Sequence, residues 1–162
     1  MNIAELSARF EFYAAKNKSI NHDANSKLKG FLQVDVQDVQ VSIKNGIKFP
    51  CLLLQTPEVE KDGGIDNITE HYEGSFVVLQ QCDVNQTAAF KMNLLYECKL
   101  ICDQIFNRMI VDSDEYFEGA QIKTSEGSFG PIAGGVYGWG VNFGFEQGYN
   151  GELNPDDWED LA

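Results

Sequence analysis

Hydrophobic residues recur at intervals of three and four near the start of the chain, a spacing that places them on one side of a helix. Ile3, Leu6, Phe10 and Tyr13 follow this spacing, and the alanines between them favour helix formation. We therefore predict a helix over residues 3–16. The polar, turn-rich stretch that comes next, residues 17–30, predicts a loop.

A second and longer helix is predicted over residues 86–110, where the same spacing continues without a break. Asn85 or Thr87 could cap its first turn. Its apolar stripe consists of Phe90, Leu94, Cys98, Ile101, Ile105 and Met109, and it is widened by Leu95, Cys102 and Phe106. We expect this long amphipathic helix to pack one face on a sheet.

Apolar runs of strand length lie between and after the two helices. The predicted strands are residues 47–56, 73–84, 136–147 and, more weakly patterned, 120–129. Residues 31–46 fit two interpretations, a strand at first or a short helix that begins after Asp35. The acidic residues 57–72 predict a long loop or the tip of a protruding hairpin. We also expect an acidic exit over residues 111–119 and a turn over residues 130–135.

The last predicted strand separates large side chains from small ones. One side carries Tyr137, Trp139, Val141, Phe143 and Phe145, and the other carries Gly138, Gly140, Asn142, Gly144 and Glu146. We expect the aromatic side to fill the core under the long helix. Because glycine weakens a strand, we expect another element or a neighbouring copy of the chain to lie close against the bare side.

The order of these elements indicates an α+β fold. Helices and strands do not alternate regularly, so we predict an antiparallel or mixed central sheet covered by the N-terminal helix and the long amphipathic helix. Residues 1–148 are predicted to form a single domain, which suits a chain of 162 residues. Residues 149–162 are predicted to be an acidic C-terminal tail.

The charge balance restricts the partners of the chain. Its 25 acidic and 12 basic residues give a net charge of −13. Phosphate backbones and anionic membranes attract Lys and Arg, so we expect neither specific nucleic-acid binding nor membrane docking. The N-terminal residues lack the basic head and apolar run of a secretory signal, and we predict that the protein is made in the cytoplasm.

The cysteines and histidines are the strongest candidates for chemistry. The four cysteines are Cys51, Cys82, Cys98 and Cys102, and we expect them to be reduced and buried in apolar elements. Cys98 and Cys102 lie one helical turn apart, but a zinc site needs two more ligands, and His22 and His71 fall in predicted polar loops. A nucleophilic cysteine paired with His71 has no orienting partner in the pattern.

Two further motifs lack the layout that their chemistry needs. The carboxylates of Asp112, Asp114 and Glu115 are crowded, whereas a calcium loop spreads its ligands over about twelve residues. The glycines around Gly135 precede a strand and do not lead from a strand into a helix, unlike a dinucleotide-binding turn. We therefore predict no catalytic residues, no cofactor, no metal site and no enzymatic activity.

The order of elements resembles that of the tail-terminator (tail-completion) proteins of long-tailed bacteriophages and the related cap proteins of contractile injection systems. The matching segments are the predicted helix 3–16, "KFPCLLLQ" (48–55), "GSFVVLQ" (74–80), the helix 86–110 and "VYGWGVNFGFE" (136–146). Together they span most of the chain, as a pattern of elements and not as a catalytic fingerprint. The glycine-rich last strand and the acidic tail after Gly148 depart from the family's pattern.

The resemblance implies a structural tail terminator or neck component that forms a hexameric ring and caps a tail tube. Such a protein is a homo-oligomer, contacts the tube and sheath or neck proteins, and is assembled into a virion tail or an injection particle. In a ring of this kind the candidate interface residues are Gly138, Gly140, Gly144, Trp158 and Leu161, the last two as apolar anchors of the tail.

The acidic stretch 57–72 has two expected places in such a ring. It carries Glu58, Glu60, Asp62 and Asp66. Carboxylates that line a pore would repel DNA phosphates, and the same stretch could instead touch the next subunit.

A different function also fits the charge. An acidic protein-binding module, either an immunity-type inhibitor or a DNA mimic, would occupy a basic partner and lose affinity as the salt concentration rises. An enzyme of unrecognised type is a third alternative.

Overall fold

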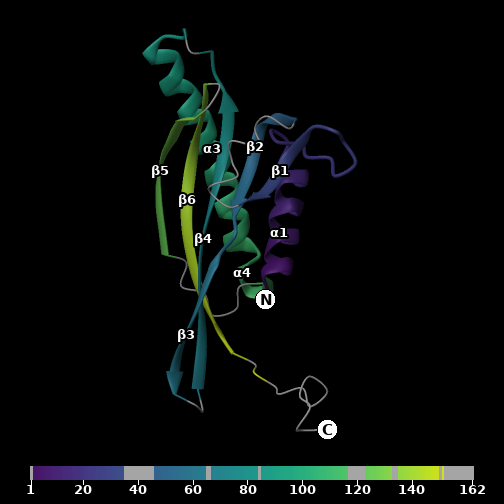
Figure 1. Ribbon diagram of the computed structural model, residues 1–162, viewed down its shortest axis with the longest axis vertical. Coiled ribbons are helices and arrows are strands. Elements are labelled where there is room, and N and C mark those ends of the chain that lie inside the picture. The colour runs from purple at the N-terminus through teal and green to yellow at the C-terminus, as the bar shows by residue number, and fades with distance from the viewer. Residues whose placement is uncertain are drawn as a thin grey trace.

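One mixed sheet carries the fold, and helices cover one of its faces (Figure 1). The structure is a computed structural model, and it describes residues 2–34, 46–64, 67–83, 85–116, 123–132, 135–149 and 151. The helices are α1 (Ile3–Lys16), α3 (Ala88–Val111) and α4 (Ser113–Tyr116). The strands are β1 (Lys29–Val34), β2 (Ile47–Gln55), β3 (Glu58–Gly64), β4 (Asn67–Gln81), β5 (Lys123–Ile132) and β6 (Val136–Gly148). The predicted α+β class is confirmed.

The described part of the sheet has six strands, and β4 is its central strand. The order is β1-β2-β4-β6-β5, with β1 and β2 parallel and the other pairs antiparallel. One side of β4 pairs with β6 over nearly its whole length. On its other side β3 pairs with residues 67–73 and β2 with residues 76–79, so β3 continues the line of β2.

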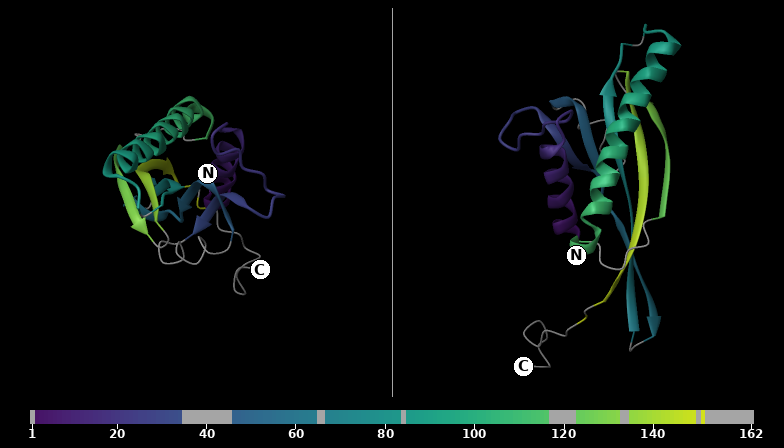
Figure 2. Two further views of the ribbon diagram at one scale, coloured as in Figure 1. Left: turned by 90° about the horizontal axis from the view of Figure 1, so that it is seen from above. Right: turned by 180° about the vertical axis from the view of Figure 1, so that it is seen from behind.

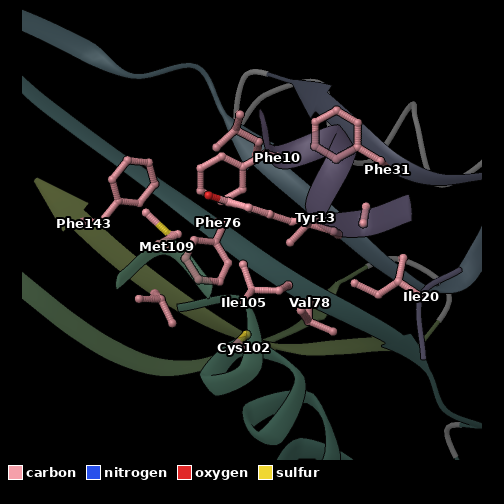
Figure 3. Packing of buried hydrophobic residues seen from close by; sticks show 14 of the residues in the cluster. Phe10, Tyr13, Ile20, Phe31, Phe76, Val78, Cys102, Ile105, Met109 and Phe143 are labelled. Carbon is pink, nitrogen blue, oxygen red and sulfur yellow. The ribbon is translucent and has the colours of Figure 1, made fainter. Parts of the chain in front are cut away.

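The main core lies between this sheet and the helices α1 and α3 (Figure 2). Phe10 of α1 is central, since its ring lies 5.4 Å from that of Phe76 and 5.5 Å from that of Phe143 (Figure 3). The aromatic side of β6 faces this core as predicted, with Phe143 and Phe145 buried and Trp139 partly buried. Burial of each such ring contributes about 1.5–3 kcal/mol.

Polar side chains cap the N-terminal ends of α1 and α3. The Asn2 side chain accepts a hydrogen bond from the Glu5 N–H and the Glu5 carboxylate accepts one from the Asn2 N–H, which forms a capping box at the predicted start of α1. Thr87 caps α3, since its Oγ1 accepts from the N–H of Phe90 at 3.2 Å. Of the two predicted caps, Thr87 is therefore the observed one.

Several predicted boundaries shift. Of the two interpretations of residues 57–72, the protruding hairpin is the observed one, because β3 pairs with the first half of β4. His71 accordingly lies in β4 and not in a loop. The loop after α1 ends earlier than predicted because β1 begins at Lys29. The remainder of the ambiguous stretch, residues 35–45, lies outside the described residues.

The region after α3 differs in two details. The expected acidic exit begins with the short helix α4, and β5 continues to Ile132 where a turn was expected. Phe90 is a further correction, because it is 47% exposed and does not belong to the core stripe of α3.

Candidate functional site

The face of the sheet that points away from α1 and α3, here called the open face, carries two kinds of surface. Near one end, β2, β4 and β6 form a second apolar cluster, whose buried members are Cys51, Leu53, Val77, Leu79 and Val136. Farther along the same strands the side chains become small and polar. This change divides the open face into an apolar part and a polar hollow.

A polar row crosses four neighbouring strands at the start of this hollow. The Ser75 hydroxyl on β4 donates to the Gln55 side-chain oxygen on β2 at 2.7 Å. On β6, Asn142 stands opposite Ser75 in the register and donates to the Ser125 hydroxyl on β5 at 2.9 Å. These bonds fix side chains that could otherwise rotate, so the row presents a fixed set of amide and hydroxyl groups.

Glycines deepen the surface on both sides of the polar row. Two adjoining hollows of about 410 and 300 Å³ share Gln55, Ser75 and Asn142 in their walls. Gly144 lies in the first, and Gly127 and Gly140 lie in the second. A trough therefore runs along the bare side of β6.

The three glycines predicted for a subunit interface differ in what surrounds them. A Cβ on Gly138 would lie 2.4 Å from the Val78 carbonyl oxygen and 2.9 Å from the Leu79 side chain, so the chain itself requires glycine there. The nearest atoms to a Cβ on Gly140 or Gly144 would be 3.4 Å away. Of the three, Gly140 and Gly144 line the trough and Gly138 does not, and their place in an interface stays a prediction.

A hairpin arm, residues 58–64 and 67–73, projects beyond the helices and the main body of the sheet (Figures 1 and 2). Every residue of β3 is exposed, including Glu58, Glu60 and Asp62 of the predicted acidic stretch. These three residues alternate along one strand, so they share one face of the arm. Glu58 also lines the trough, which therefore meets the base of the arm. Asp66, Trp158 and Leu161 lie outside the described residues.

The arm is braced where it joins the body. The Gln147 side-chain amide on β6 donates to the Glu70 carboxylate and to the Tyr72 hydroxyl, each at 3.0 Å. Lys61 of β3 lies 3.6 Å from Glu70. The hydrogen bonds from Gln147 and Tyr72 and the charge of Lys61 lower the pKa of Glu70. This network joins β3, β4 and β6, so the arm leaves the body in a defined direction.

A further exposed surface lies on the outer side of α3. Met92 is 65% exposed, Tyr96 59% and Leu100 45%, and the four-residue spacing puts them in one stripe. The sequence prediction missed this outer stripe because it assigned one apolar side to the helix. The signal was present in the sequence, since these three residues repeat with a helical spacing opposite to Leu94 and Cys98.

The cysteines lie in the core, as their place in the apolar pattern predicts. All four are free and buried. Burial raises the pKa of the Cys98 and Cys102 thiols to about 12, so both are neutral at physiological pH. Cys102 donates its S–H to the Trp139 carbonyl oxygen at 3.1 Å. Within the described ranges, no three His, Cys, Asp or Glu side chains lie close enough together to hold one metal ion.

Both histidines are engaged elsewhere. His22 is buried, accepts the Gly30 N–H on Nδ1 at 3.2 Å and therefore carries its proton on Nε2, 3.1 Å from Glu11. His71 lies 3.2 Å from Glu146 across the β4–β6 pair. These contacts tie the loop after α1 to the helix and the base of the arm to β6.

Comparison of the sequence with protein-family models and with curated proteins gives no match. In the part of the chain that the structure describes, no helix is both long and apolar enough to cross a membrane. The trough, the arm and the outer stripe of α3 are the candidate contact surfaces of the described residues.

Proposed function

We propose that the chain is a structural protein that forms a hexameric ring and caps a tube, as tail terminators of phages and caps of contractile injection systems do. In this proposal its partners are further copies of itself, the tail tube and sheath or neck proteins. The assembled particle is a virion tail or an injection device, and the role is structural, without catalysis.

The arm is the observation that carries the proposal. A ribbon of two or three strands buries little apolar surface and is marginally stable on its own. Here such a ribbon is braced at its base and exposed along the whole of β3. Contact with another molecule would bury part of this exposed ribbon and stabilise it. In a ring, one arm on each subunit would reach the next subunit and repeat the same contact around the axis.

The outer stripe of α3 supports the same assignment. Charged groups are depleted and Tyr and Met are enriched at the centre of protein interfaces. Met92, Tyr96 and Leu100 provide such a surface on a chain whose net charge is −13. Two acidic copies can approach most closely where carboxylates are few.

A paired substitution on α3 tests this proposal. Changing Met92 and Tyr96 together to Lys places two charges in the outer stripe without touching the core. We expect the variant to remain folded by circular dichroism and to lose the oligomer that the wild-type protein forms, as measured by light scattering at micromolar concentration. Asn107→Lys, which adds a charge at another exposed position of the same helix, is the matched control and should assemble normally.

Two outcomes would contradict the proposal. One is a wild-type protein that stays monomeric at every concentration and binds a basic protein with an affinity that falls as salt rises, which would favour the acidic binding module. The other is an oligomer of fixed small size, such as a dimer, that cannot close a ring.

A further inference from the structure

Both arginines of the chain, Arg9 and Arg108, meet where α1 packs on the end of α3. Their guanidinium groups contact the buried Asp112, at 3.6 Å from Arg9 and 2.8 Å from Arg108. Arg9 also lies over the Tyr116 ring at 3.3 Å. Beside this junction the two helices leave a groove of about 170 Å³, here called the basic groove.

The basic groove has an apolar floor and a cationic rim. Phe12, Tyr13 and Ile105 form the floor, and Lys16 and Arg108 stand on the rim. Lys16 Nζ lies 5.8 Å and the Arg108 guanidinium 5.6 Å from the centre of the Phe12 ring. The described residues that line this groove include no carboxylate, although the chain has about twice as many acidic as basic residues.

A ligand for such a groove needs an aromatic or aliphatic anchor with carboxylates on both sides. The last residues of the chain have this composition, since "DDWED" (156–160) places Trp158 between two pairs of acids. Residues 152–162 carry five carboxylates and no Lys or Arg. An aromatic anchor in a pocket supplies much of the energy of an interface, and opposite charges on the rim orient it.

The position of β6 indicates which copy supplies the tail. β6 ends beside the arm, where the Tyr149 N–H donates to the Ile68 carbonyl oxygen at 3.0 Å. The groove lies along the C-terminal half of α1, whereas the arm projects past the N-terminal end of that helix (Figures 1 and 2). The last described residues of β6 therefore lie at the opposite end of α1 from the groove of the same copy.

We infer that the basic groove between α1 and α3 binds the acidic C-terminal segment, residues 152–162, of a second copy of the chain. This inference rests on the proposed function, because it names the contact by which a ring subunit holds the next one. Trp158 occupies the apolar floor, and the carboxylates on either side of it face Lys16 and Arg108.

Fluorescence of Trp158 in the full-length chain tests the contact. Trp139→Phe removes the other tryptophan and keeps an aromatic ring on the core, so the emission then reports Trp158 alone. We expect emission typical of a solvent-exposed tryptophan at low protein concentration and a shift to shorter wavelength as the concentration rises. In that background Lys16→Glu should raise the protein concentration at the midpoint of this shift at least about tenfold.

Lys18→Glu is the matched control. It makes the same charge change two residues away at an exposed position that does not line the groove, and it should leave the shift unaltered. Reversing the charges of Asp157 and Glu159 to Lys should restore binding to the Lys16→Glu protein. Restoration would support the contact even if Lys16→Glu alone lowers stability.

Three results would overturn the inference. The first is solvent-like emission at every concentration, and the second is a blue-shifted emission that does not depend on concentration, which would mean that the chain binds its own tail. The third is an equal effect of Lys16→Glu and Lys18→Glu. Light scattering on the same samples separates this inference from the proposed function. Closed rings with an exposed Trp158 would leave the ring proposal standing, whereas Trp158 docking in a dimer would leave only the tail contact.

Discussion

Gly138 and Gly127 lie on adjacent strands of the open face, but only Gly138 is required by the sheet itself. A Cβ at Gly138 would press on the backbone of β4, whereas a Cβ at Gly127 would have no atom within 4 Å. Gly138→Ala should therefore lower the free energy of unfolding by about 1–3 kcal/mol. Gly127→Ala should raise it by about 0.5–1 kcal/mol, because alanine is favoured over glycine in a strand.

Urea unfolding of the two variants measures both effects. Equal losses would contradict this account of the glycines. A folded and stable Gly127→Ala protein that assembles poorly would show that the trough is kept open for a partner.

Buried thiols make stability depend on alkaline pH. Burial raises the pKa of Cys51, Cys98 and Cys102 from 9.0 to about 12, and it also raises the pKa of Tyr13. Between pH 9 and 12 the unfolded chain has lost these protons and the folded chain has kept them, so stability falls as the pH rises. The stabilisation from these protonated thiols is fully present below pH 9.

Urea titrations at pH 7.5 and pH 10, with a reducing agent, measure this dependence. We expect a loss of at least about 2 kcal/mol at the higher pH, since each thiol can contribute up to about 1.4 kcal/mol per pH unit. An unchanged unfolding free energy would mean that the thiols are accessible to water in the folded protein.

At the scale of elements, α3 depends on its cap as well as on its core contacts. Thr87→Ala leaves the Phe90 N–H without its side-chain acceptor and should cost about 1 kcal/mol of unfolding free energy. The neighbouring change Gln86→Ala is the control, at an exposed position outside the helix, and should cost less than about 0.5 kcal/mol. A Thr87→Ala protein as stable as the control would show that packing alone positions the helix.

The two long helices could be predicted from the sequence because each has one fully apolar side. α1 has the predicted bounds, and α3 starts and ends within two residues of them. Hydrophobic spacing reports burial, and the side chains that it selected, such as Leu94 and Met109, are buried. The short helix α4 has only four residues, too few for a spacing to appear.

The sequence predicts the arm only as one of two alternatives, the other being a long loop, because the pattern of β3 is not that of a half-buried strand. A strand that is half buried alternates apolar and polar residues, but β3 is exposed on both faces and contains acids and glycines. β4 accordingly begins at Asn67, six residues before the apolar run that predicted it. The outer stripe of α3 was missed for the opposite reason. Apolar residues usually indicate burial, but Met92, Tyr96 and Leu100 are apolar and exposed.

At the scale of the whole molecule, the arm and the outer stripe occupy different surfaces, and the chain carries a net charge of −13. Contacts between two different surfaces are heterologous, so they generate a closed ring or an open filament. Self-repulsion among acidic copies opposes assembly, and the outer stripe of α3 offers a contact surface whose named residues carry no charge. The proposed closed ring would use both surfaces of every copy.

Native mass spectrometry of the wild-type protein at micromolar concentration, at low and moderate salt, tests the central claim most directly. The ring proposal predicts one dominant assembly of six copies, with no ladder of larger species. A chain that remains monomeric across this range, or that stops at a dimer, would contradict it.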